Sequence, residues 1–326
     1  MRCVHCYVTH AKKTAMRGDA LYELLDDLAA AGTMTVTFTG GEIGLRKDLY
    51  DIIAHARAKH FEVKLLSSGT RWGEKDWNRI AELGVTSVRF SLYGSCEHVH
   101  ESVTLVDGSF ERTVASARAM KERGLDVAFS CSVMNLNAHD IGDLLDLGKR
   151  YDIPVVIDPQ IVHMDSGDNA PAQTRASFEQ LVAMYDDPRV RAMMYFDDPC
   201  SSPNKNLKPC GVGDKSVFIR STGDVYPCSR WPIAGGNVLQ QPVLEIFRTS
   251  ETFHQTRALT YATMSGCSSC GDSGSCSPCA AINMQENGGI ERPAESVCRT
   301  TAAKATSFHG ASKQQRSFRA SLPIVA

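Results

Sequence analysis

The chain has 326 residues, of which 43% are hydrophobic, and this is enough for a large core and more than one domain. The net charge of −2 and the isoelectric point near 6.5 argue against nucleic-acid and membrane-surface binders, which need a basic excess. No stretch approaches the ~20 apolar residues of a membrane span, and no export signal is visible. We therefore expect a cytoplasmic protein in which the clustered thiols, among twelve cysteines in all, are metal ligands rather than disulfides.

Residues 19–158 alternate between helical and strand patterns. The expected helices cover 19–31, 48–60, 75–83, 110–123 and 141–151, and the expected strands cover 33–39, 63–67, 87–93, 126–133 and 154–158. This alternation predicts a parallel sheet with right-handed crossovers, in which ligands bind at the carboxyl ends of the strands. Short motifs follow the expected strands at that rim, at 40–42, 68–69, 91–94 and 135–137.

Residues 159–199 are expected to form a connector that covers the open rim, with a helix at 173–186. His163, Asp165 and Asp168 would face a substrate if the rim is the active site, although a solvated polar loop is the reading that we favour. From residue 200 the pattern changes to short strands, glycine and proline turns, and cysteines. Hydrophobic periodicity is lost after about residue 300, so we expect a loosely held tail over 301–326.

Two cysteines open the chain, in Cys3-Val4-His5-Cys6. By itself such a pair is a zinc half-site, a redox pair or two unrelated thiols. Gly40-Gly41-Glu42 follows the first expected strand, where glycines let the backbone approach a ligand closely.

Eight of the twelve cysteines lie between Cys200 and Cys298, and they form the most specific pattern of the sequence. Twelve residues separate Cys210 from Gly223, and four more lead to Cys228. The remaining cysteines of this region are Cys267, Cys270, Cys276, Cys279 and Cys298. Eight thiolates satisfy two four-cysteine cluster sites with none left over. A zinc ribbon is the alternative, and it would leave several cysteines without a role, namely Cys200, Cys210, Cys228 and Cys298.

Together these features resemble radical S-adenosylmethionine (SAM) enzymes with a C-terminal SPASM auxiliary-cluster domain. The resemblance implies an α/β fold, with a partial (βα)6 TIM-type barrel at 1–158, a connector at 159–199 and a cysteine-rich SPASM domain at 200–300. Cys3 and Cys6 match the second and third ligands of the family loop Cys-x-x-x-Cys-x-x-Cys. The first ligand would lie two positions before Met1, and the first strand is also absent, so we expect an N-terminally truncated chain.

The resemblance also implies the cofactors. In the family, a [4Fe–4S] cluster on this loop binds SAM at its open iron and, once reduced, cleaves SAM to a 5′-deoxyadenosyl radical. Gly40, Gly41 and Glu42 would contact the methionyl ammonium, and Ser91 would contact the ribose or carboxylate, unless it bonds only to backbone. The first auxiliary cluster would be held by Cys200, Cys210, Cys228 and Cys279, and the second by Cys267, Cys270, Cys276 and Cys298.

Some residues fall outside these patterns or depart from them. Cys131 lies in an expected buried strand and is read as a small hydrophobe, whereas Cys96 lies in a loop. The pair His100-Glu101 resembles a segment that is frequent in peptide-modifying members. Sulfatase-maturing relatives carry an aspartate base directly after the cysteine that matches Cys228, and the serine at this position, Ser229, weakens a formylglycine-generating assignment.

The resemblance therefore implies an oxidoreductase that modifies a ribosomally made peptide or a protein side chain. An auxiliary cluster near the substrate would accept an electron or bind a substrate thiolate, which suits crosslinking, thioether formation or epimerisation. An electron donor such as flavodoxin or ferredoxin is the second expected partner, and neither nucleic acid nor membrane is expected. The alternatives are an enzyme that modifies a tetrapyrrole or other small molecule, and a non-catalytic iron–sulfur or zinc protein.

Overall fold

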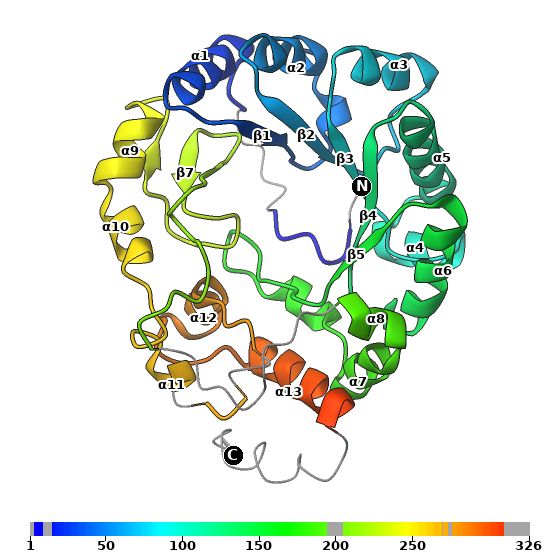
Figure 1. The fold of residues 1–326 in the computed structure, drawn as a ribbon, viewed down its shortest axis with the longest axis vertical. Coiled ribbons are helices and arrows are strands. Elements are labelled where there is room, and N and C mark those ends of the chain that lie inside the picture. The colour runs from blue at the N-terminus through cyan, green and yellow to red at the C-terminus, as the bar shows by residue number, and fades with distance from the viewer. Residues whose placement is uncertain (1–2, 9–14, 194–204, 269, 273–275, 310–326) are drawn as a thin grey trace.

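The computed structural model describes residues 3–8, 15–193, 205–268, 270–272 and 276–309. A five-stranded parallel sheet forms one side of the molecule, with its strands in the order β1-β2-β3-β4-β5 and its helices outside (Figure 1). A three-stranded sheet, β6-β7-β8, belongs to the cysteine-rich part of the chain and lies on the same side of the molecule as β1 and α1 (Figure 1). The sheet curves as one wall of a barrel, which confirms the expected α/β class.

The strands of the large sheet follow one another in chain order, and each neighbouring pair is parallel. They are β1 (Thr35–Phe38), β2 (Glu62–Ser67), β3 (Ser87–Ser91), β4 (Asp126–Ser132) and β5 (Val155–Asp158). The helices that alternate with them are α1 (Gly18–Ala30), α2 (Leu49–Ala58), α3 (Glu74–Glu82), α5 (Ser109–Glu122) and α6 (Ile141–Tyr151). Their ranges agree with the expected ones to within a few residues at each end.

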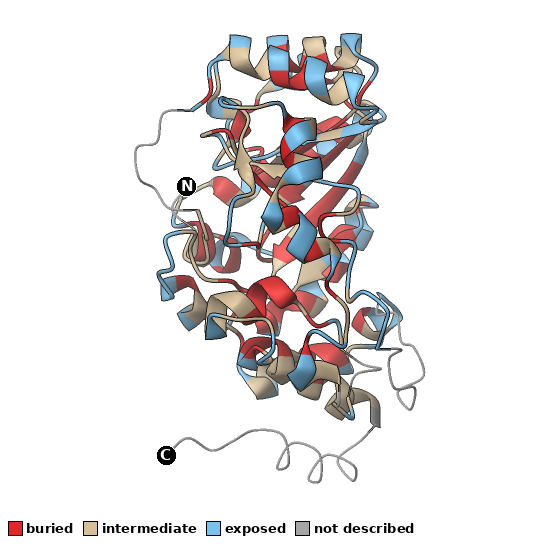
Figure 2. Cartoon of the chain, turned by 90° about the vertical axis from the view of Figure 1, so that its left-hand side faces the viewer, coloured by how far each residue is buried: buried red, intermediate tan, exposed pale blue. Residues whose placement is uncertain are grey.

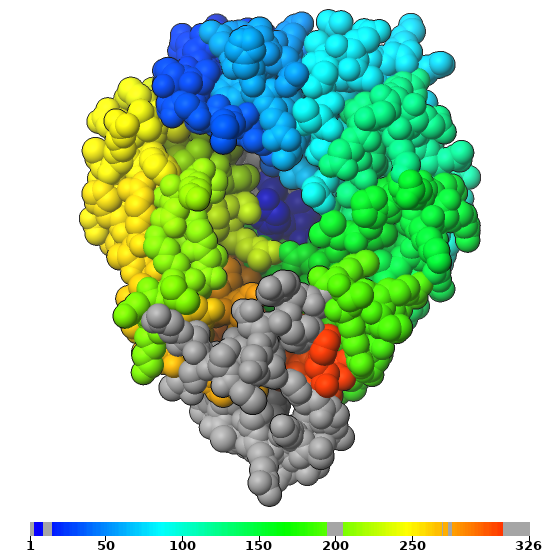
Figure 3. All heavy atoms as spheres, in the orientation of Figure 1, coloured from blue at the N-terminus to red at the C-terminus, as the bar shows by residue number. Residues whose placement is uncertain are grey.

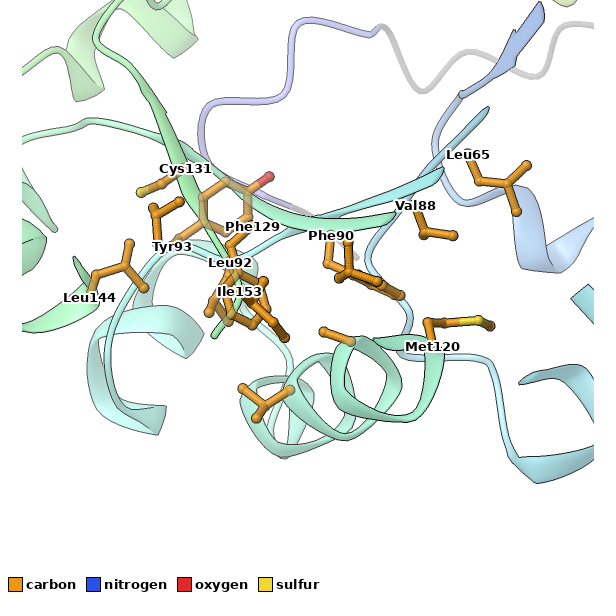
Figure 4. Packing of buried hydrophobic residues seen from close by; sticks show 14 of the residues in the cluster. Leu65, Val88, Phe90, Leu92, Tyr93, Met120, Phe129, Cys131, Leu144 and Ile153 are labelled. Carbon is orange, nitrogen blue, oxygen red and sulfur yellow. The ribbon is translucent and has the colours of Figure 1, made fainter. Parts of the chain in front are cut away.

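The core lies between this sheet and its outer helices, where the buried faces of both meet (Figure 2). Phe90, Leu92 and Phe129 are fully buried, and Figure 4 shows them gathered above α5. Burial of one such large apolar side chain contributes about 1.5–3 kcal/mol, so the core fixes the positions of the strand ends.

One helix between the strands of the large sheet was not predicted. The sequence indicated a long loop between β3 and α5, but α4 (Glu97–Thr104) lies there. The helix is short, and it ends at Leu105 in the left-handed conformation, with φ 56°. Val99 and Val103 bury its inner face, so tertiary packing rather than a long periodic pattern stabilises it.

The connector runs through η3 (Ala170–Thr174), α7 (Phe178–Asp186) and α8 (Pro188–Met193), and α7 packs against η2 (Ala138–Asp140), the short helix that follows β4. The helix expected from residue 173 therefore starts later than predicted. Ser177 ends the preceding turn because its hydroxyl accepts a hydrogen bond from the backbone N–H of Gln180, whose side chain bonds back to Ser177. This reciprocal cap fixes the start of α7.

The cysteine-rich part contains short elements joined by turns. They are β6 (Phe218–Ile219), β7 (Asp224–Tyr226), β8 (Gly236–Asn237), α9 (Val243–Thr249), α10 (Glu251–Arg257), α11 (Ser265–Ser268), α12 (Ala280–Asn287) and α13 (Glu295–His309). The short helix η1 (Ile43–Leu45) belongs instead to the barrel, between β1 and α2. Gly223 turns the chain between β6 and β7 with φ 90°, and a Cβ there would lie 2.7 Å from Asn237 Oδ1. The turn that leads to Cys228 therefore requires glycine.

The loose tail expected from residue 301 is wrong for residues 301–309, because α13 continues to His309. Ala303 is fully buried in the main core, and α13 lies along α7 (Figure 1). Arg191 adds a hydrogen bond of 2.9 Å to the carbonyl oxygen of Ser307. The pattern was missed because this helix buries small residues, which give little hydrophobic periodicity. Residues 310–326 of the expected tail lie outside the described residues.

Within the part of the chain that the structure describes, every helix is too short or too polar to cross a bilayer.

Candidate functional site

The loop that carries Cys3 and Cys6 lies at the floor of a central hollow, where Figure 3 shows the N-terminal segment in dark blue. The backbone N–H of Val4 donates to the carbonyl of Val103 on α4 at 3.1 Å. The N–H of Cys6 donates to the carbonyl of Cys3 at 3.0 Å, which closes a turn that brings the two thiols near each other. Helix α4, which was not predicted, therefore holds this loop through a backbone hydrogen bond.

The environment of Cys3 favours its protonated thiol in the free protein. Burial, and to a smaller extent the neighbouring Cys6 thiol, raise the pKa of Cys3 to about 11. A metal binds the thiolate and releases the proton, so loading of iron at this loop is coupled to deprotonation. The Cys6 thiol lies 3.8 Å from the carbonyl oxygen of Val8.

A stack of aromatic rings packs behind the loop. The ring of His5 meets the edge of Tyr93 with centroids 4.7 Å apart, and Tyr93 stacks on His100 at 5.7 Å. The N–H of Tyr93 donates to Nδ1 of His100 at 3.0 Å, and Phe110 packs on the other edge of His100. Burial lowers the pKa of His5 and of His100 to about 4, so both rings are neutral at pH 7. The segment around His100 thus supports the loop.

Glu42 is held by four hydrogen bonds at the end of β1. Its Oε1 accepts from the N–H of Gly44 at 3.1 Å and from Ser67 Oγ at 2.6 Å. Its Oε2 accepts from the N–H of Ser68 at 2.9 Å and from the Ser68 hydroxyl. A carboxylate has about four acceptor positions, and these bonds occupy that number. Glu42 therefore clamps the end of β1 to the end of β2.

The other sites predicted for SAM lie at the same rim. A Cβ placed on Gly40 or Gly41 would meet no described atom within 4 Å, so space is open above both glycines. Ser91 is the last residue of β3, and its hydroxyl bonds to the phenol of Tyr93 rather than only to backbone. The structure brings these residues to the rim, and their contacts with SAM stay a prediction.

Four of the predicted ligands surround one cavity. Cys267, Cys270, Cys276 and Cys298 line it together with apolar residues. Burial raises the pKa of Cys276 to about 11 and that of Cys298 to about 12. The hydroxyl of Thr301 lies 3.2 Å from the sulfur of Cys276. These residues come from α11, the following loop and α13, so the fold gathers thiols that are far apart in the sequence.

A second group contains Cys210, Cys228 and Cys279. Burial raises the pKa of Cys228, and the nearby thiols of Cys279 and Cys210 raise it further. The backbone N–H groups of Arg230 and Trp231 bond to the Cys228 sulfur and act in the opposite direction. The fourth predicted ligand of this group, Cys200, lies outside the described residues.

These two groups fit iron–sulfur clusters in their chemistry. A cluster distributes its thiolate ligands over different irons, so the ligands surround a central volume, as the four cysteines of the cavity do. A single zinc ion instead needs four ligands converging at about 2.3 Å from one point. Among the described residues, no three cysteine, histidine or acidic side chains converge in that way.

A pocket of about 240 Å³ lies between the cluster loop, the connector and the cysteine-rich part. Tyr7 and Ser229 line it, directly after Cys6 and Cys228 in the chain. The other lining residues are Val162, His163, Met164, Asp165, Gly167, Arg220, Arg230, Trp231, Pro232, Met284 and Gln285. The pocket therefore lies beside both a predicted SAM-cluster ligand and a predicted auxiliary ligand.

The charged groups of this pocket are paired. Arg220 Nη1 lies 3.3 Å from Asp165 Oδ2, and Arg230 Nη2 lies 2.5 Å from Asp158 Oδ2. His163 and Asp165 face the pocket, whereas Asp168 is exposed and accepts a bond from the N–H of Ala170 in its own turn. The solvated-loop reading therefore fits Asp168 but not the other two. Arg220 and Arg230 were missed by sequence reasoning, although the position of Arg230 two residues after Cys228 was a usable signal.

The two remaining cysteines lie apart from these groups. Cys131 is buried in β4, and the side-chain N–H of Asn137 lies 3.5 Å from its sulfur. Cys96 is exposed directly before α4.

The chain matches two family models. Residues 1–148 match the radical SAM superfamily, and residues 210–271 match the SPASM model, described as an iron–sulfur cluster-binding domain. The second match includes Cys210, Cys228, Cys267 and Cys270.

Relatives and solved structures extend the likeness over most of the chain. An AdoMet-dependent heme synthase of Methanosarcina barkeri is 21% identical, over 79% of this chain and 81% of the relative. A mycofactocin maturase of Mycolicibacterium smegmatis is 26% identical, over 85% of this chain and 74% of the relative. Streptococcus suis SuiB bound to precursor peptide SuiA matches with a TM-score of 0.69 at 15% identity, over 91% of this chain and 72% of that one. At that identity the structural match shows the fold alone.

Proposed function

Because the chain belongs to the radical SAM superfamily and carries a SPASM iron–sulfur cluster-binding domain, we propose that it oxidatively modifies a peptide or protein side chain. The observation that carries this proposal is the pocket that touches Tyr7 on one side and Ser229 on the other. A residue bound there would lie beside the loop of Cys3 and Cys6 and beside the auxiliary ligand Cys228.

The cofactors of this family are [4Fe–4S] clusters and SAM. Cys3 and Cys6 would hold the catalytic cluster, whose chemistry when reduced would be the one-electron cleavage of SAM to methionine and a 5′-deoxyadenosyl radical. We assign the positioning of SAM to Gly40, Gly41 and Ser91, with Glu42 fixing the shape of the rim. Because Glu42 already accepts four hydrogen bonds, a contact with the methionyl ammonium would have to share its oxygens. We assign the eight thiols of the SPASM region to two auxiliary clusters, as the sequence predicts.

The charges of the pocket favour a peptide. The guanidinium groups of its described lining, Arg220 and Arg230, are each paired with a carboxylate, so the charges of these groups balance. A peptide segment also presents amide donors and acceptors without net charge. The peptide-modifying relatives support the same choice, since one is a mycofactocin maturase and one structural neighbour was solved with a precursor peptide.

A tetrapyrrole substrate is the second candidate, because heme synthases are among the relatives at similar coverage. Such a macrocycle carries several carboxylates, which would need cations that are not already paired. Arg220 and Arg230, the guanidinium groups of the described lining, each have an acidic partner, and this makes the tetrapyrrole the weaker proposal.

The experiment is an anaerobic reconstitution with iron and sulfide, followed by incubation with SAM, a reductant and each candidate substrate. The reductant is dithionite or a flavodoxin or ferredoxin system, the proposed electron donors. We expect 5′-deoxyadenosine and a loss of hydrogens from a small peptide encoded beside this gene. Deoxyadenosine formed only with an iron coproporphyrin would favour the second candidate. Stoichiometric zinc without deoxyadenosine would overturn both.

A matched pair of variants tests whether the pocket binds the substrate. His163→Ala removes a side chain that lines the pocket, whereas Asp168→Asn changes a nearby exposed residue of the same connector. We expect His163→Ala to lower peptide modification at least tenfold and to raise the fraction of deoxyadenosine formed without product. Equal effects of the two variants would place the substrate elsewhere.

A further inference from the structure

The hydroxyl of Thr301 has two acceptors within reach and one proton to give. Thr301 Oγ1 lies 3.2 Å from the sulfur of Cys276 and 2.9 Å from the carbonyl oxygen of Val297, one turn earlier on α13. The residue is 8% exposed, so water does not compete freely for this proton. A threonine hydroxyl donates one hydrogen bond, so it serves only one of these acceptors at a time.

The surroundings of Thr301 link it to the thiol cavity. Cys276 and Cys298 both line that cavity, and Cys298 lies one turn before Thr301 on the same helix. Helix α13 packs along α7, and Ala303 is fully buried in the main core, so the helix is held in place. Lys304 is half-buried, and its ammonium acts electrostatically on Cys276. The Cys276 side of the cavity therefore has both a hydroxyl donor and a cation, whereas the donor at Cys267 is the side chain of Asn283.

We propose that the Thr301 hydroxyl is a reorienting donor that sets the reduction potential of a cluster held at Cys276 and its three partners. This proposal rests on the assignment of that cluster under the proposed function. When the cluster is oxidised, the hydroxyl donates to Val297; when a one-electron reductant of the ferredoxin or flavodoxin class reduces it, the hydroxyl donates to Cys276. The proton stays on the Thr301 oxygen, and only the electron is transferred.

Two physical reasons support this reorientation. Hydrogen bonds to charged acceptors are roughly twice as strong as neutral ones, so added negative charge on the sulfur attracts the proton. Both acceptors already lie within reach, so no heavy atom has to move. A donor that stabilises the reduced form more than the oxidised form raises the potential, since hydrogen bonds to the sulfurs tune such clusters.

The test is a redox titration followed by electron paramagnetic resonance on the reconstituted full chain, without peptide substrate. Cys276→Ala identifies the signal of this cluster, because it should remove that signal alone. Thr301→Val removes the donor, and Thr301→Ser keeps it. Thr300→Val is the matched control, because Thr300 makes the same backbone bond, to Ser296 at 2.9 Å, without a cysteine partner.

We expect Thr301→Val to lower the ratio of reduced to oxidised cluster about tenfold at a fixed poise, which equals 59 mV for one electron. Thr301→Ser should stay within about twofold of the parent, and Thr300→Val should not differ from it. Iron content must match the parent in each threonine variant, so that a shift reflects the potential and not lost metal. A Thr301→Val potential equal to that of the parent, or an equal shift in Thr300→Val, would overturn the proposal. Deoxyadenosine release is scored separately, so failure of the peptide assignment would leave this result unaffected.

Discussion

Glu42 shows how one side chain shapes the rim. Its carboxylate joins the residue after β1 to Ser67 and Ser68 at the end of β2, and also to the N–H of Gly44. A buried donor that loses its acceptor costs about 1–3 kcal/mol, so these groups depend on the carboxylate. The residue thus fixes the backbone beside Gly40 and Gly41 before any ligand binds.

We expect Glu42→Ala to lower the free energy of unfolding by about 2–3 kcal/mol, because several donors lose one charged acceptor. Glu62→Ala is the control, since the partly exposed Glu62 at the start of β2 bonds to the exposed Thr35, and it should change stability by about 0.5 kcal/mol or less. Urea denaturation measures both. An equal, small effect of both variants would show that the clamp is not needed for folding.

Two histidines make stability depend on pH: His5 in the cluster loop and the buried His100 behind it. The pKa of His5 and of His100 is about 4 in the folded chain, below the ordinary value of 6.5. The unfolded chain therefore binds more protons between these two values. Their contribution is complete above pH 6.5 and is lost as the pH falls toward 4.

We expect the free energy of unfolding of the apoprotein to fall by about 1 kcal/mol per pH unit for each histidine between pH 6 and 5. His100→Asn keeps an acceptor for the N–H of Tyr93 but does not titrate, so it should remove the share of His100. The exposed His98 of the same helix is the control, as His98→Asn. Urea denaturation at several pH values gives the slopes, and identical slopes for parent and His100→Asn would contradict the prediction.

At the scale of elements, α4 and α13 decide how the site is supported. Helix α4 contributes no predicted cluster ligand. The carbonyl oxygen of its Val103 nevertheless holds the cluster loop, because it accepts a hydrogen bond from the N–H of Val4. Helix α13 carries Cys298 and Thr301 at one end and packs on α7 at the other. The barrel and the cysteine-rich part are therefore joined by a helix that also contributes a predicted cluster ligand.

The packing of α13 predicts an asymmetry between its two faces. Ala303→Glu buries a charge against α7, so we expect a loss of at least about 3 kcal/mol in the free energy of unfolding. Ala305 lies about 200° around the helix and is only partly buried, so Ala305→Glu should cost about 1 kcal/mol or less. Thermal or urea unfolding measures both. A tolerated Ala303→Glu would contradict the observed contact.

At the scale of the whole molecule, the candidate substrate pocket belongs to no single segment. The cluster loop gives it Tyr7, the connector gives it Asp165, and the cysteine-rich part gives it Arg220 and Ser229. The ion pair of Arg220 and Asp165 links the last two, and the N–H of Asp165 bonds to the carbonyl of Tyr7 at 2.7 Å. Changes in one part of the chain will therefore alter a pocket that all three form.

The separation of the thiols into two groups predicts the iron content of variants. Cys267→Ala combined with Cys298→Ala removes two ligands of one cavity, so we expect about four fewer irons per reconstituted chain. Cys96→Ala is the control, because that exposed thiol lies outside both groups, and it should leave the iron content unchanged. Iron and sulfide assays test this. Loss of one metal ion rather than about four would favour a mononuclear site.

The order of strands and helices in the barrel and the likeness to radical SAM and SPASM proteins could be predicted from the sequence. The helical spacing of Leu49, Ile52, Ile53 and Ala56 on α2 marks a buried face, and the cysteine spacing marks a cluster domain, because both signals are local. Features that depend on distant contacts emerge only in the folded structure. Glu42 meets Ser67 and Ser68, α4 and α13 gain their stability from packing, and Thr301 reaches Cys276 from another segment. Spacing along the chain carries no information about such meetings, since folding alone brings those residues together.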